Sequence, residues 1–466
     1  MPSFAPLCVL LLFLCSCQLK GPKYEGPVLS QPLTDSFLED RDAGHHLNLS
    51  WSAFEDRTLS SYQRRLVRSN FDLRTALFRR NQARAALGTA LSARQPQVSA
   101  SASATRNRSS DNSLGGGFGD NYYSLYQVTG SLSYELDLWG RIQRQVEAGI
   151  ADTQAAEANI SSVLLSLQSQ FARSYFALRF LDAEAGVLRD AVASREETLA
   201  LAKTREESGL TSGLDAARAE GELARAEAAL LSLAGPRAQL KYSLAVLLGQ
   251  NPSSFRLKEK KSAGTLPIIH PGLPLSLLSR RPDLAVAERR LAAATARIGV
   301  AEARFYPELS LTGSGGLASL QVNDFLKKSS TVSSVGPSLT APIFQGGRLR
   351  ANLTRARAEQ QEALTVFQQA TLQAIAEVES ALASAHARAR EAEARRRTVE
   401  ASREAFRLSR LRYREGVDNY LGVIDAQREL LEAERASVRT RGQRFTAAVE
   451  LIQALGGPAL QNYPSK

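Results

Sequence analysis

The sequence contains one module written twice, and this internal repeat limits the possible folds more than any other feature. Gly140 and Gly209 of the first half align with Gly347 and Gly416 of the second, both at an offset of 207 residues. The sequences around these glycines match as well, so the correspondence covers long segments. Each half is therefore expected to contain the same order of secondary-structure elements.

Each half contains two segments in which apolar and polar residues alternate. The clearest is Tyr126–Leu138, where apolar side chains occupy one parity and Gln, Thr, Ser, Glu and Asp occupy the other. Gln97–Thr105 precedes it, and Pro307–Gly315 and Ser333–Phe344 are weaker counterparts in the second half. A period of two indicates strands with one apolar and one polar face. The sequence therefore predicts one β-hairpin in each half.

A helical period follows the Gly-Arg pair of each half. From Arg348 to Glu415 the apolar residues recur at spacings of three, four and seven, and no Pro or Gly occurs. This pattern predicts a coiled-coil-like helix, about 100 Å long at about 1.5 Å per residue. Its counterpart, Arg141–Ser208, contains Gly149 and Gly186, where a helix can bend.

Shorter helices flank each long one. A helix is predicted over Leu66–Ala93, and Pro96 stops it because proline has no amide donor and restricts the preceding residue. The glycine after each long helix predicts a tight turn. Shorter helices then return over Leu214–Leu248 and Leu421–Leu455, and Gly235-Pro236 is expected to kink or break the first of them.

Four strands per chain do not close a barrel. Lipid does not tolerate open sheet edges, since each unpaired amide or carbonyl there costs several kcal/mol. Other copies must complete the sheet, and a trimer supplies twelve strands, within the range of outer-membrane barrels. The apolar face then contacts lipid and the polar face lines a wet lumen. The alternative is a soluble β-sandwich, for which two hairpins separated by long helices make a poor core.

The N-terminus resembles an export signal. The apolar run from Leu7 to Leu14 is typical of the core of a signal peptide. It ends in Leu14-Cys15-Ser16-Cys17, which resembles the bacterial lipobox and implies cleavage before Cys17 and acylation of that residue. Gln18 follows, where a signal for inner-membrane retention has Asp, so an outer-membrane destination is implied. The alternative is an ordinary signal peptide that contains cysteines. The expected domains are a lipoprotein signal peptide over 1–16, a lipidated extended segment over 17–60, a first repeat over 61–265, a second repeat over 266–457 and a tail over 458–466.

The composition argues against enzymatic and nucleic-acid functions. All three cysteines lie in the first 17 residues, which excludes a disulfide framework in the body of the chain. The four histidines are scattered, so no metal site, cofactor or Cys/His nucleophile pair is expected. The net charge is +11, but arginines are interleaved with glutamates in segments such as Glu391–Gly416. This pattern is typical of a solvated helix face, so we expect no nucleic-acid partner.

Several motifs together resemble one family: the lipobox with Gly21–Pro27, then Arg280–Gly316, Val335–Ala351 and Tyr413–Glu434. They are similar to those of the TolC-like outer-membrane factors, in the NodT-type lipoprotein branch that pairs with resistance-nodulation-division pumps. The resemblance implies a mainly α chain with a membrane β-barrel, whose homotrimer forms a 12-stranded outer-membrane barrel on a long periplasmic α-helical barrel. It also implies passive efflux of drugs or other small toxic compounds. The implied partners are a periplasmic adaptor protein, an inner-membrane transporter and outer-membrane lipid.

The resemblance also assigns roles to residues near the two predicted turns. Leu421 matches an apolar constriction of the periplasmic gate, and Asp425 matches a ring of carboxylates; their spacing of four places both on one helix face. The adaptor-facing turns are implied at Gly209, Leu210, Gly416 and Val417.

Three further expectations remain open from the sequence. Arg218 aligns with Asp425, and we hypothesise that Arg218, or Arg412 and Arg414, pairs with Asp418 to hold a closed state. A duct for metal-ion efflux or type I protein secretion shares the same features. A structural coiled-coil lipoprotein of the periplasm explains the helices but not the alternating hairpins.

Overall fold

The computed structural model describes residues 19–27, 36–39, 49–110, 122–260, 264–270, 272, 274 and 276–458. The predicted signal peptide and Cys17 lie outside the described residues, as do residues 459–466 of the predicted tail. The chain forms two compact units. The sheet unit comprises residues 1–29, 79–157 and 286–368, and the turn unit comprises residues 30–78, 158–285 and 369–466.

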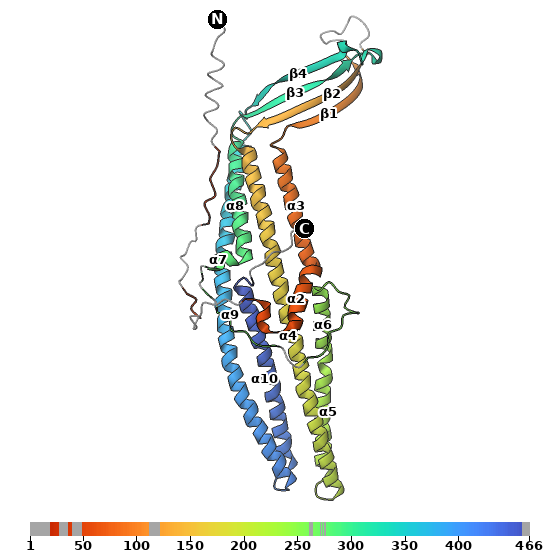
Figure 1. Cartoon of the computed structure of the whole chain (residues 1–466), viewed down its shortest axis with the longest axis vertical. Helices are drawn as coiled ribbons and strands as arrows, with labels where there is room; N and C mark the ends of the chain where they lie inside the picture. Colours follow the sequence, from red (N-terminus) through yellow and green to blue (C-terminus); the bar gives the residue numbers. More distant parts are fainter. Residues whose placement is uncertain are drawn as a thin grey trace. The chain divides into compact units, whose positions relative to one another are not determined.

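The sheet unit contains a four-stranded antiparallel sheet in the order β1-β2-β3-β4 (Figure 1). Pairing of β2 with β3 joins the predicted hairpins of the two halves into one sheet. The last strand ends at Thr340, four residues before the predicted Phe344. The strands are β1 Gln97–Arg108, β2 Tyr122–Leu136, β3 Glu308–Ser319 and β4 Thr331–Thr340.

The register separates the two faces of the sheet as the alternation predicts. Val128 lies opposite Ala102 of β1 and Leu317 of β3, which places apolar residues on one face. Ser131 lies opposite Ser99 and belongs to the other face. The sheet therefore has one apolar and one hydroxyl-rich face.

Two helices of 67 residues each follow the hairpins: α4 Arg141–Glu207 and α9 Arg348–Arg414. α4 is one continuous α-helix through Gly149 and Gly186, the two positions at which the sequence allows a bend. At Gly149 an added Cβ would lie 3.2 Å from the Leu87 Cδ1 atom. The glycine at this position therefore allows close helix packing, and α4 does not break there.

The returning helices differ between the halves as predicted. The first half has α5 Gly213–Ser232 and α6 Ala234–Leu247, whereas the second has the single helix α10 Tyr420–Ala454. The break falls at Leu233, three residues before Pro236. Pro236 has no amide for an i−4 bond, and its ring clashes with the carbonyl of Ser232, so α5 ends there.

The single helix predicted over Leu66–Ala93 is wrong. The structure has α2 Arg57–Ser69 and α3 Phe71–Ser92, separated by Asn70, whose backbone is extended at ψ 133°. The Asn70 Oδ1 atom accepts the amide of Leu73 at 2.9 Å, and its Nδ2 donates to the carbonyl of Leu247 at 2.8 Å. Asn70 thus caps α3 and bonds to the end of α6, a contact that local propensity does not reveal.

The second half begins with α7 Ser276–Arg280 and α8 Pro282–Ala303.

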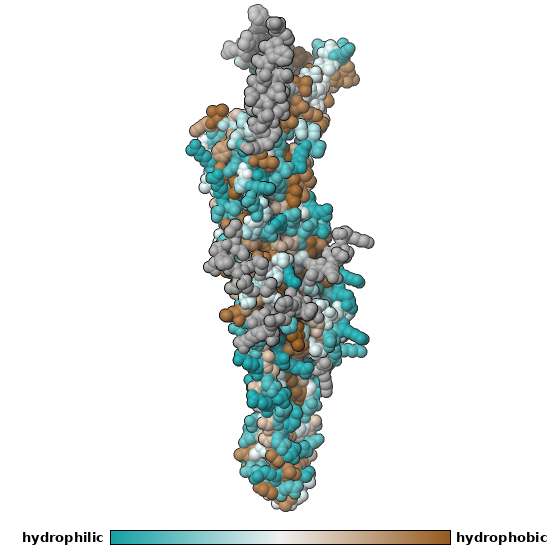
Figure 2. Space-filling model, turned by 60° about the vertical axis from the view of Figure 1, so that its left-hand side comes forward, coloured by the Kyte–Doolittle hydropathy of each residue, from teal (hydrophilic) through white to brown (hydrophobic). Residues whose placement is uncertain are grey.

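The core of the turn unit is rich in aromatic side chains. The ring of Phe176 lies 4.8 Å from that of Phe54 and 4.9 Å from that of Phe445, centroid to centroid. On the face shown in Figure 2, polar and apolar side chains are interspersed over the helices. Among the described helices, none combines the length and the apolar character needed to cross a bilayer. Short 3₁₀ helices occur at Trp51–Phe54, Val322–Asp324 and Lys328–Ser330.

Candidate functional site

The two long helices end in turns of identical geometry. Gly209 and Gly416 adopt φ of +69° and +74°, a left-handed conformation that favours glycine. In each turn the amide after the glycine, that of Leu210 or Val417, donates at 2.9 Å to the carbonyl five residues earlier. This is the Schellman motif. The two halves of the repeat therefore share the same backbone hydrogen bonds at these turns.

Both turns expose an apolar side chain. Leu210 and Val417 are each 68% exposed. In a Schellman motif the residue at this place commonly packs back onto its own helix. These two side chains remain open to solvent in the single chain and are accessible to another molecule.

Arg205, in the last turn of α4, links the two turns. Its Nη1 donates to the carbonyl of Tyr413 at 3.1 Å and to that of Arg414 at 3.4 Å. Its guanidinium carbon lies 4.9 Å from the centre of the Tyr413 ring. The cation satisfies carbonyls that the end of α9 leaves without helical partners. α4 and α9 are thereby joined at their ends.

The predicted gate residues share one open face of α10. Leu421 is 47% exposed and the Asp425 side chain is 66% exposed. The Asp425 Oδ1 atom lies 3.9 Å from the Arg428 Nη1 atom. The opposite face of α10 is buried in a small core with α4, α5 and α9, made by Ala202, Ala219, Tyr413, Tyr420, Val423 and Ile424.

A buried carboxylate beside this face was missed by the sequence reasoning. The Glu222 side chain of α5 is 4% exposed, accepts hydrogen bonds from Arg225 and Arg428, and lies 3.8 Å from Arg195 of α4. The bond from the Arg428 Nε atom measures 3.0 Å. Burial raises the pKa of Glu222, but the hydrogen bond from Arg428 and the charges of the three arginines outweigh it and hold this pKa below its usual range.

The sequence carries one signal for this cluster. The buried residues of α5 recur at spacings of three and four, and Glu222 occupies a position between Ala219 and Ala226 in that stripe. A carboxylate at a buried position requires a cation. The sequence does not show which cation, because Arg428 belongs to the other half of the chain.

Asp418 has a partner at the second turn. The Arg412 Nε atom lies 3.3 Å from the Asp418 Oδ2 atom, so Arg412 forms one of the ion pairs hypothesised for this acid. Arg218 lies instead 4.0 Å from Asp215, and Arg414 pairs with the adjacent glutamate at 3.6 Å. Apart from Asp215, which is half-buried, the side chains of these pairs are exposed, and exposed ion pairs contribute about 0–1 kcal/mol each.

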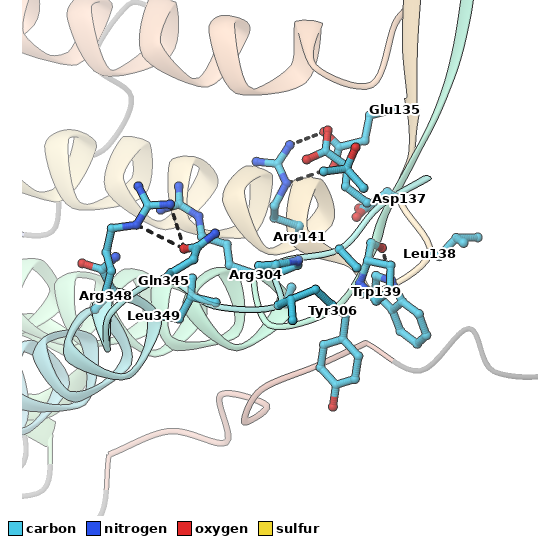
Figure 3. A pocket seen from close by; sticks show the side chains of 18 of the residues that line it. Glu135, Asp137, Leu138, Trp139, Arg141, Arg304, Tyr306, Gln345, Arg348 and Leu349 are labelled. Carbon is cyan, nitrogen blue, oxygen red and sulfur yellow. Dashed lines mark hydrogen bonds and ion pairs between the residues drawn. The ribbon is translucent and has the colours of Figure 1, made fainter. Parts of the chain in front are cut away.

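A second polar cluster lines a cavity of about 750 Å³ at the helix end of the sheet (Figure 3). The Arg141 Nε atom donates to the Glu135 carboxylate at 2.9 Å across the connection from β2 to α4. The Trp139 indole donates to the carbonyl of Pro307 at 2.8 Å, and its ring stacks on Tyr306 with centroids 4.7 Å apart. These contacts fix the start of α4 against the start of β3.

The segment 19–27, here named the strap, is bound to this junction. Arg144 donates to the carbonyls of Lys20 and Gly21, both at 3.0 Å. A Cβ added to Gly21 would lie 2.4 Å from the Cα of Gly299 in α8. The strap begins two residues after the predicted lipidation site, so its contacts hold the chain next to that site against the sheet unit.

Known proteins share this geometry. The profile of the outer membrane efflux protein family matches residues 63–250 and 273–457. The outer membrane protein OprJ of Pseudomonas aeruginosa is 34% identical to this chain over 98% of the chain and 96% of its own length. The toluene efflux pump outer membrane protein TtgF of Pseudomonas putida is 32% identical over 90% and 86%, respectively. The structure of the outer-membrane channel OprN matches with a TM-score of 0.86 at 31% identity, over 95% of this chain and 99% of that one.

An antiparallel sheet with one apolar face, carried on long helices that end in paired tight turns, defines a channel protein of the bacterial outer membrane. Within that class, the chain belongs to the outer membrane efflux protein family. Its function is that of the outer-membrane channel of an efflux system, and its location is the outer membrane, with helices that extend into the periplasm.

Proposed function

We propose that three copies of this chain close a 12-stranded barrel and form one duct, through which drugs or other small toxic compounds pass passively from the periplasm to the exterior. One observation carries the proposal: within the described sheet, β1 and β4 are each paired on one side only. Unpaired edges in lipid cost several kcal/mol per group. Copies joined head to tail, β4 to β1, satisfy both edges and close a ring.

Exposed apolar residues beside β4 support this assembly. Ile343 and Phe344 are 93% and 89% exposed, and Val335 of the strand itself is 81% exposed. Side chains of this size are rarely left in water when they lie together on one surface. Contact with a second copy and with lipid accounts for their exposure.

We place the aperture of the duct at Leu421 and Asp425. Their open helix face supports this assignment, because it leaves both side chains free to approach the threefold axis. Three aspartates that converge there repel one another and attract cations. The ion pair between Arg412 and Asp418 then belongs to the closed state.

We assign the partners from the family to which the chain belongs. The exposed Leu210 and Val417, each next to its turn glycine, face a periplasmic adaptor protein, and an inner-membrane resistance-nodulation-division transporter supplies the energy. Cys17 carries the lipid anchor. The name of TtgF supports small apolar compounds as cargo. The chain itself performs no chemical step in this proposal.

The test is single-channel conductance of the purified full-length protein in planar bilayers, with its oligomer size measured in the same preparation. Wild type should form trimers with a small, cation-selective conductance, and Asp425→Ala should raise the conductance and reduce the cation selectivity. Glu434→Ala removes a carboxylate from the opposite side of α10, nine residues further along, where Glu434 pairs with Arg403, and should leave both unchanged. Monomers without conductance, or equal effects of the two variants, would contradict the proposal.

A further inference from the structure

Two arginines lie on the apolar face of the sheet, at the end remote from the helices. Arg106 lies opposite Ser124, and Arg108 lies opposite Tyr122, in an unbroken register with β2. Because side chains alternate along a strand, both arginines belong to the same face as Ala104. In the proposed barrel this face is turned to lipid, so the inference rests on the proposed function.

The register also sets the depth of these arginines. Leu136 and Tyr126 bound the apolar stripe of β2. Their ten residue steps span about 34 Å along the strand, which a tilt of about 40° reduces to about 26 Å, close to the apolar band of about 25 Å in outer-membrane barrels. Arg106, level with Ser124, is two steps beyond Tyr126, about 5 Å outside the band. The helices attach at the Leu136 end, so the arginines reach the headgroups of the outer leaflet.

Both cations lack an acidic partner among the described residues. Their side chains are exposed, and the guanidinium carbons of Arg106 and Arg108 lie 5.7 and 5.6 Å from the ring centre of Tyr122. The aromatic ring attracts and orients both groups without neutralising them. A cation on the lipid-facing surface is costly unless an anion meets it.

We propose that Arg106 and Arg108 bind the phosphate groups of the anionic glycolipid of the outer leaflet. A guanidinium group matches phosphate oxygens with two parallel hydrogen bonds, so arginine suits this ligand better than lysine. Two such groups on one strand, about 7 Å apart, share the Tyr122 ring and present several donors to one headgroup. The assembled barrel carries three of these sites around its outer rim.

The experiment is native mass spectrometry of the full-length protein in detergent, titrated with a diphosphorylated, multiply acylated glucosamine disaccharide and with the same lipid lacking its phosphates. Wild type should bind the phosphorylated lipid about 30-fold more tightly than Arg106→Gln/Arg108→Gln does, given the attraction of each arginine to anionic lipid. Arg106→Lys/Arg108→Lys should fall between the two. Arg395→Gln/Arg397→Gln removes two arginines with the same spacing from α9 and should bind as wild type.

Three results would overturn the site: equal binding by wild type and the glutamine variant, equal binding of both lipids, or displacement of the lipid by millimolar inorganic phosphate. The same spectra report whether each variant is a trimer. If the glutamine variant does not assemble, the lysine variant and the comparison of the two lipids on wild type test whether the arginines bind the lipid phosphates. Conductance is measured alongside: variants that conduct as wild type but show no lipid effect overturn only this inference, whereas absence of conductance in wild type contradicts the proposed function.

Discussion

Glu222 is the residue on which three helices depend at the turn end of the chain. It accepts hydrogen bonds from Arg225 of its own helix and from Arg428 of α10, and it faces Arg195 of α4. Of the three arginines, only Arg195 is buried, whereas Arg225 and Arg428 are exposed. Removing the carboxylate is costly mainly because Arg195 then lies buried without an anion.

The first prediction follows from the burial of Arg195. Glu222→Gln should loosen the packing of α5 on α10 by about 2 kcal/mol, because the buried guanidinium group of Arg195 then has no anion beside it, while Arg225 and Arg428 remain solvated. Hydrogen exchange of amides in 216–232 and 420–435 should accelerate. Glu220→Gln, an exposed change on the same helix, is the control and should have no effect. Equal exchange in the two variants would remove Glu222 from this role.

The second prediction concerns pH. The pKa of Glu222 is lowered in the folded chain, so its stabilisation is fully present above its unfolded value of about 4.3 and is lost as pH falls through the lower folded value. Amide protection near the turns should therefore be constant from neutral pH to about pH 5 and should fall in stronger acid. Glu222→Gln should lack this acid step. An identical acid profile in wild type and variant would be the contrary result.

At the level of elements, the two Schellman turns keep the same backbone conformation in both halves of the repeat. Gly209 and Gly416 have the same sign of φ and the same hydrogen bonds, although the residues around them differ. A left-handed residue is inexpensive only when it is glycine. The turns therefore depend on the backbone, and their side chains are free to vary.

The third prediction tests whether the turn requires glycine at its left-handed position. Gly416→Ala should lower the stability of the turn by about 1 kcal/mol, because φ of +74° is unfavourable for a residue with a Cβ. Gly221→Ala, inside α5 where no heavy atom lies within 4 Å of the added Cβ, should instead stabilise by up to about 1 kcal/mol. Thermal unfolding followed by circular dichroism in detergent measures both. Shifts of the same sign would refute the argument.

At the level of the whole molecule, the strap connects the predicted lipid anchor to the channel. Its backbone carbonyls are held by Arg144, and Lys20 Nζ lies 4.9 Å from the centre of the Tyr306 ring. Cys17, the predicted lipidation site, precedes the strap by two residues. These contacts therefore hold the segment that follows the predicted lipidation site against the start of α4 and against α8.

The fourth prediction concerns Gly21, where the backbone of the strap lies closest to the backbone of α8. Gly21→Ala places a Cβ 2.4 Å from the backbone of Gly299 and should release the strap. Cleavage by trypsin after Lys23 should become at least about tenfold faster, in proportion to the population of the released form. Gly26→Ala is matched, since Gly26 also has positive φ but nothing within 4 Å, and should leave cleavage unchanged. Equal cleavage rates in both variants would show that the strap is not held there.

Much of the architecture follows from local periodicity, and so does one part of the candidate site. Alternation over Tyr126–Leu138 reports a strand with two different faces, and the glycine-free heptads after Arg348 report a long helix. The shared face of Leu421 and Asp425 follows from a spacing of four. Each of these depends only on residues close in sequence, so the sequence alone was sufficient.

Other features depend on residues far apart in the sequence, and no local pattern contains them. Asn70 ends a helix because its side chain bonds the carbonyl of Leu247, 177 residues away. Glu222 is charged and buried because Arg428, 206 residues away, reaches it. Periodicity shows which face of an element is covered but not by what, since many partners satisfy the same pattern. The sequence determined the strands, the two long helices, the glycine turns and the shared helix face of Leu421 and Asp425; only the tertiary structure decided which distant groups cap, neutralise and clamp these elements.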